Sequence, residues 1–96
     1  MAQTTYFVCN KYEDAYYRYN EESRKFFSSR AFKASPSSLT FSVNEERYVC
    51  LDKNSFMSKL RNKEIAVGSV VVLTFVADDV IMSSLREYKI NLIERG

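Results

Sequence analysis

Residues 70–77 read VVVLTFVA, and no other part of the chain has a stronger preference for β-structure. Valine dominates this run, and β-branched side chains pack well on the pleated surface of a sheet. The run has the length of a buried strand, whereas a bilayer-spanning helix needs roughly 20 apolar residues. It therefore predicts the central strand of a sheet in a protein without a membrane-spanning segment.

Two further regions upstream predict strands. TTYFVC at residues 4–9 is β-branched and aromatic, which favours a first strand. Residues 39–43 alternate apolar and polar side chains, and residues 47–51 form a second strand-like run on the other side of Asn-Glu-Glu at 44–46. Two such runs joined by a short polar turn indicate a β-hairpin.

A short helix is predicted between this hairpin and the valine run. Asp52 or Asn54 can cap a helix over residues 55–61, because both side chains accept hydrogen bonds from the first free N–H groups. Phe56 and Leu60 are four residues apart, so they share one helix face and are expected to point to the core.

The segment after the valine run allows two structures. An Asp-Asp pair at 78–79 predicts a turn. Residues 80–93 are then predicted to return as a long strand, with a bulge at the Ser-Ser pair at 83–84. A helix over 80–88, capped by one of the two aspartates, is the alternative.

The aromatic segment at residues 11–29 also allows two structures. Asn10 and Glu13 have the spacing of a capping box, which marks the start of a helix. On a helical wheel, Tyr17 lies outside an arc of about 120° that holds most of the apolar side chains. The residues of this expected core stripe are Tyr12, Ala15, Tyr16, Tyr19, Ser23, Phe26 and Phe27. The pattern favours a helix, and a hairpin turning at residues 20–23 is the alternative.

Residues 30–38, RAFKASPSS, predict a loop, because Pro36 and its neighbouring serines interrupt any regular pattern. Together, the segments predict one α+β domain over residues 1–96 with the order β-α-β-β-α-β-β. A mainly antiparallel sheet of about five strands would carry one or two packed helices.

The composition of the 96 residues excludes most catalytic chemistry. The sequence has no histidine, which rules out Ser-His and Cys-His dyads and histidine-containing zinc sites. Its two glycines do not suffice for a phosphate-binding loop. Carboxylate pairs at 45–46 and 78–79 are the remaining candidates for Mg²⁺, but adjacent turn residues point in different directions. We therefore expect no enzyme, no metal and no cofactor.

The two cysteines, Cys9 and Cys50, lie far apart in apolar runs. Small secreted domains usually contain more cysteines, and isolated free cysteines are usually buried. The N-terminal residues also lack the basic and apolar regions of a signal peptide. Reduced, packed thiols in a cytoplasmic protein are the expectation.

Basic and aromatic side chains gather in two parts of the chain, although the net charge is only +2. No acidic residue stands between Glu22 and Glu45, and a second basic cluster surrounds the short helix. Cations for phosphates and rings for bases are what a single-stranded nucleic acid requires, so RNA or single-stranded DNA is one candidate partner. The residues of this hypothesis are Arg24, Lys25, Arg30, Lys33, Lys59, Arg61 and Lys63. In the alternative interpretation, these side chains are a helix end and a solvated face.

Binding of another protein is the leading hypothesis, because tyrosine and arginine are frequent in interface hot spots. The expected contact residues are Tyr17, Arg18, Arg30, Phe32 and Lys33. Small domains without catalytic residues often serve as inhibitors, adaptors or accessory factors, including viral proteins that act on host machinery. An exposed sheet edge beside residues 70–77 would also allow strand addition or a homodimer.

Overall fold

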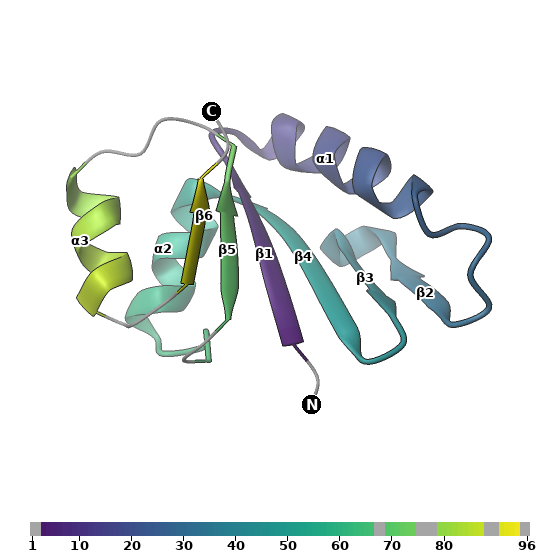
Figure 1. Cartoon of the computed structure of the whole chain (residues 1–96). Coiled ribbons are helices and arrows are strands. Elements are labelled where there is room, and N and C mark those ends of the chain that lie inside the picture. The colour runs from purple at the N-terminus through teal and green to yellow at the C-terminus, as the bar shows by residue number, and fades with distance from the viewer. Residues whose placement is uncertain (1–2, 67–68, 75–78, 88–90, 95–96) are drawn as a thin grey trace.

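The computed structural model describes residues 3–66, 69–74, 79–87 and 91–94, and its sheet contains strands from both ends of the chain (Figure 1). The elements are β1 (Gln3–Cys9), α1 (Tyr12–Arg24), β2 (Phe32–Ser35), the 3₁₀ turn η1 (Pro36–Ser38), β3 (Thr40–Val43), β4 (Glu46–Asp52), α2 (Lys53–Arg61), β5 (Val70–Leu73), α3 (Asp79–Glu87) and β6 (Asn91–Glu94). The predicted α+β class is confirmed.

The sheet has six described strands in the order β2-β3-β4-β1-β5-β6, and it is mixed rather than mainly antiparallel. β1 pairs in parallel with both β4 and β5, and β5 pairs in parallel with β6. Only β2, β3 and β4 form antiparallel pairs. Parallel neighbours need a crossover connection; α1 lies in the connection from β1 to β4, and α3 lies in the connection from β5 to β6. The valine run is therefore not the central strand, because β4 and β1 occupy the middle of the sheet.

Successive side chains of a strand point to opposite faces, so the sheet supports a separate core on each side. Tyr6 and Val8 of β1 face α2 and α3, whereas Phe7 and Cys9 face α1. The core on the α2 side also contains Leu51, Phe56, Leu60, Ile65, Val71, Leu73 and Ile81. The core on the α1 side also contains Ala15, Tyr19, Leu39, Phe41, Val43, Cys50 and Val72.

The helix predicted in the aromatic segment is confirmed, but its start and its buried face differ from the prediction. Lys11 occupies the N-cap position, and no side chain caps the helix, so the predicted capping box with Asn10 does not form. Tyr12 and Tyr16 are 59 % and 50 % exposed, and Phe27 is 63 % exposed. These rings therefore lie outside the core stripe in which they were expected.

A buried carboxylate accounts for part of this difference. Glu22 is only 7 % exposed, and its two carboxylate oxygens accept hydrogen bonds from Arg18 at 3.2 Å and Lys25 at 3.0 Å. The helix thus turns Ala15, Tyr19, Glu22 and Ser23 inward. The ion pairs compensate the charge of Glu22, and Tyr16 lies at the edge of the inward face, whereas Tyr12 is the first residue of the helix.

Two of the other predicted segments are confirmed. The hairpin of β3 and β4 turns at Asn44-Glu45, and Asn44 has a φ of 57°, which asparagine tolerates better than most residues. The predicted short helix is α2, and Phe56 and Leu60 are both buried as expected, but Asp52 at the N-cap position forms no capping hydrogen bond with its side chain.

The predicted loop and the predicted long strand are wrong. Residues 30–38 contain β2 and η1 instead of a loop, because Phe32–Ser35 pairs along its whole length with β3. Residues 80–93 contain α3 and β6, which agrees with the helical alternative. Residues 75–78, with the second half of the valine run and Asp78, lie outside the described residues. None of the described helices is long and apolar enough to cross a membrane.

Candidate functional site

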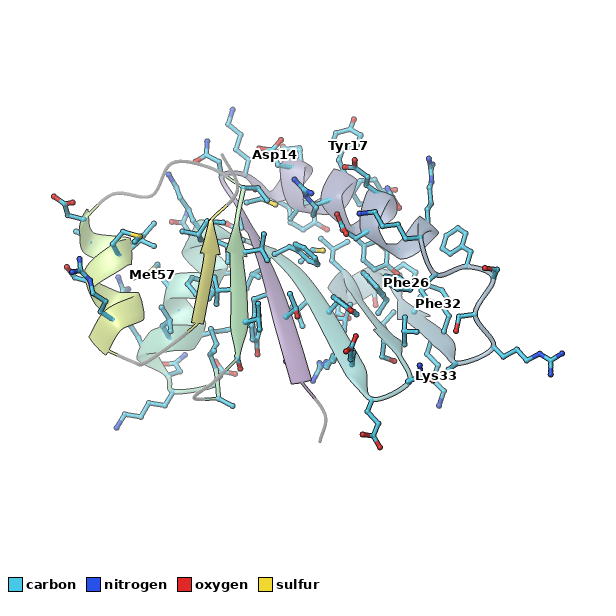
Figure 2. All side chains as sticks on the ribbon, in the orientation of Figure 1. Asp14, Tyr17, Phe26, Phe32, Lys33 and Met57 are labelled. Carbon is cyan, nitrogen blue, oxygen red and sulfur yellow. The ribbon has the colours of Figure 1, made fainter. Side chains whose placement is uncertain are left out.

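A row of aromatic rings runs from the middle of the sheet to the surface at β2. Tyr48 stacks between Phe7 and Phe41, with ring centroids 6.2 and 4.8 Å away. Phe41 contacts Phe32 at 5.9 Å, and Phe32 contacts the exposed Phe27 at 5.4 Å. These five rings, called the aromatic row below, connect the buried core to an accessible apolar side chain. Phe26 and Phe32 both contact Phe41, each with a centroid distance of 5.9 Å, and Figure 2 labels both near the end of α1.

β2 is the end strand of the described sheet, and it pairs with β3 on one side only. Lys33, Ala34 and Ser35 are exposed, and Phe32 is half-buried on the aromatic row. An end strand presents backbone N–H and C=O groups that are free to pair with a further strand. β2 therefore combines a free backbone edge with an apolar ring next to it.

The face of the sheet that points away from α1 is polar and contains hollows near β2. Lys33, Ser42 and Arg47 line a hollow of about 280 Å³. A larger groove of about 480 Å³ adjoins it between β4, η1 and α2, and Thr40 and Arg47 line both. Lys59 also lines the larger groove. Within the described part of the chain, Lys33, Arg47 and Lys59 form no ion pair, and Asp52 and Glu64 also line the larger groove.

The predicted protein-binding residues fall into two groups. Arg30, Phe32 and Lys33 lie together at β2 and in the turn before it. Tyr17 and Arg18 lie on α1, and Figure 2 shows Tyr17 on the outer side of that helix. The prediction thus combined two separate surfaces.

Tyr17 and Arg18 line a third hollow, of about 350 Å³, at the carboxyl ends of β1 and β5. The chain leaves β1 toward β4 on one side and later returns to β5 on the other, and such a switch point is a common ligand site in parallel sheets. The connection from β1 to α1 is Asn10-Lys11, without the glycines that let a backbone approach a phosphate. Arg18 is also engaged by Glu22, so this hollow lacks an available cation on α1.

The predicted nucleic-acid-binding residues do not share one surface. Arg24 and Lys25 are at the end of α1, where Lys25 binds Glu22. Lys33 points to the opposite sheet face, which it shares with Lys59. Arg61 is the last residue of α2, and Lys63 follows in the turn beyond it. Arg47 was not among the predicted residues, although its place two and four residues before the apolar Val49 and Leu51 was a usable signal.

Among the described residues, no three histidine, cysteine or acidic side chains lie close enough together to hold a metal ion. Glu46 instead accepts a hydrogen bond from the Tyr48 hydroxyl at 2.8 Å. Asp78 lies outside the described residues.

Both cysteines are buried and free, and they lie in the core on the α1 side. Burial raises the pKa of the Cys9 thiol, and a hydrogen bond with the Thr74 side chain partly opposes this shift. Burial also raises the pKa of Cys50, to about 12. The thiolate is the nucleophilic form of cysteine, so neither side chain is suited to attack a substrate at neutral pH.

Comparisons with known proteins give this site no counterpart. No known protein family matches the chain, and no curated protein or solved structure is significantly similar to it.

Proposed function

We propose that the protein is a small, non-enzymatic module that binds another protein by pairing β2 with an extended segment of the partner. It would act as an inhibitor, adaptor or accessory factor. The observation that carries the proposal is the free edge of β2, which lies beside an aromatic row that reaches the surface at Phe27. In strand addition, backbone hydrogen bonds supply affinity, and side-chain pockets on alternate positions supply specificity.

The aromatic row gives such a contact a rigid base. Phe32 is held by Phe41 on one side and Phe27 on the other. A partner side chain that covers these rings would remove apolar surface from water without having to order a flexible anchor first. The proposed contact residues at this surface are Phe27, Arg30, Phe32 and Lys33.

We also propose that this module acts in the cytoplasm. Two cysteines that are free and buried in the same core, with no disulfide between them, support this location. Secreted domains of this size usually depend on disulfides for stability.

The test combines peptide selection with amide exchange. We expect extended peptides selected from a random library to slow exchange of the β2 amides at least tenfold. Phe27→Ser is expected to weaken their binding on the order of tenfold, because an exposed aromatic anchor is lost. Tyr16→Ser is the matched control, since Tyr16 is similarly exposed but lies on α1 outside the aromatic row. Loss of binding in Tyr16→Ser but not in Phe27→Ser would place the contact on α1 and refute the proposal.

A second candidate function is binding of single-stranded nucleic acid on the opposite sheet face. Lys33, Arg47 and Lys59 favour it, because these three cations form no ion pair within the described residues and line adjoining hollows. This function predicts that a labelled single-stranded RNA binds at low salt and loses affinity steeply as salt rises. The double variant Lys33→Gln/Arg47→Gln should lose this binding, whereas Lys11→Gln should keep it. Absence of binding at low salt by fluorescence anisotropy eliminates the candidate.

A further inference from the structure

The two faces of β2 differ in chemistry. Phe32 and Ala34 lie on the α1 side, where Phe32 packs on the core. Lys33 and Ser35 lie on the other side and line the polar hollow. A strand added to the free edge of β2 would extend both faces, because its successive side chains also alternate between them.

On the polar side, Lys33 ends a row of residues that crosses three strands. Ser42 is directly opposite Lys33, and Arg47 is directly opposite Ser42. Neighbouring strands are about 4.8 Å apart, so the next position of this row lies about 5 Å beyond Lys33. Neither Lys33 nor Arg47 forms an ion pair with a carboxylate among the described residues. An acidic side chain at the next position would form a cross-strand pair with Lys33, whereas a basic one would be repelled.

On the apolar side, Phe32 is directly opposite Val43, and Phe27 covers part of its ring. A partner residue opposite Phe32 would lie next to the rings of Phe32 and Phe27. Only an apolar side chain gains free energy there, because a charged one would lose water without finding a partner.

We infer that the partner segment alternates apolar and acidic residues, with the apolar residue opposite Phe32 and the acidic residue opposite Lys33. This inference rests on the proposed pairing of β2. A second copy of β2 fits less well, because its sequence FKAS has no acidic residue and antiparallel pairing would place Lys33 or Ser35 opposite Lys33. A segment of another protein that alternates apolar and acidic side chains would fit both the apolar side at Phe32 and the polar side at Lys33.

The test uses two short synthetic peptides and three proteins. In one peptide valine alternates with glutamate, and in the other valine alternates with lysine. The proteins are the wild type, Lys33→Glu and Lys63→Glu. The last variant changes the net charge equally, but Lys63 lies beyond α2 and lines neither polar hollow. Affinities are measured by titration at low ionic strength, because salt screens exposed charges.

The wild type and Lys63→Glu are expected to bind the glutamate peptide at least threefold more tightly than the lysine peptide, and Lys33→Glu is expected to reverse this preference. The same preference in all three proteins would overturn the assignment of an acidic residue opposite Lys33. In that case, slowed exchange of the β2 amides would still uphold the pairing of β2 itself. Failure of both peptides to slow that exchange would overturn the pairing and the inference together.

Discussion

Replacing Phe41 with alanine is expected to lower the free energy of unfolding by about 3–5 kcal/mol, the usual loss for a large aromatic side chain in a core. Phe41 is 1 % exposed, and it is the ring on which the core of the α1 side converges. Its centroid lies within 6 Å of four other rings, those of Tyr19, Phe26, Phe32 and Tyr48. The cavity left by alanine would border α1, β2 and β4 at once.

Urea unfolding followed by far-ultraviolet circular dichroism measures this loss. Phe27→Ala is the control at the surface end of the same aromatic row, and it is expected to cost less than about 1 kcal/mol because Phe27 is largely exposed. Equal losses in the two variants would contradict the arrangement of the row from core to surface. Phe41→Ala is also expected to weaken peptide binding at β2, since Phe32 loses its support.

The free energy of unfolding is expected to fall as the pH rises from about 9 toward about 12. Burial raises the pKa of Cys50 from 9.0 to about 12, so the folded protein keeps this proton after the unfolded chain has lost it. The unfolded state then binds fewer protons than the folded state, and the free energy of unfolding must decrease with pH. The stabilisation is fully present below pH 9, and its loss amounts to a few kcal/mol by the usual value of about 1.4 kcal/mol per pKa unit.

Urea unfolding at a series of alkaline pH values measures this slope. Cys50→Ala removes the titrating group, so its free energy of unfolding should depend less on pH than that of the wild type. Cys9 and Tyr48 also have raised pKa values, so part of the slope should remain in the variant. An identical slope in both proteins would show that Cys50 ionises in the folded state as readily as in the unfolded chain.

Local sequence patterns predicted the elements that depend on short-range signals. Residues 4–9 lie in β1, the strand-like runs around Asn44 form a hairpin, and Phe56 and Leu60 identify the buried face of α2. In each case, one stretch of the sequence contains both the element and the signal for it.

Elements that depend on distant neighbours were not predictable in this way. β2 has the sequence FKAS, without a β-branched residue, and it is a strand because β3 pairs with it. Residues 80–93 are rich in apolar side chains and resemble a strand, but β5 and β6 are parallel and need a crossover between them. That need arises from the sheet and cannot be read from the segment alone.

Only part of the candidate site could be predicted, because its other residues also depend on parts of the chain that are distant in sequence. Arg30, Phe32 and Lys33 were identified, but Phe27 was assigned to the core because a helical wheel was extended past the end of α1. The helix ends at Arg24, and Phe27 follows in a turn where the wheel no longer describes side-chain directions. Arg47 was missed because its importance comes from the register that aligns it with Ser42 and Lys33.

The central place of β1 also has a consequence for biosynthesis. Tyr6 pairs with Val49 of β4 and Val71 of β5, so both neighbours of β1 are translated well after it. The side chains of β1 that face α2 remain uncovered on the ribosome until β4 and α2 have been made, whereas α1 follows β1 directly and can cover Phe7 and Cys9 early. We expect the nascent chain to be most prone to aggregation in this interval, and β1 to be the segment that a chaperone would cover.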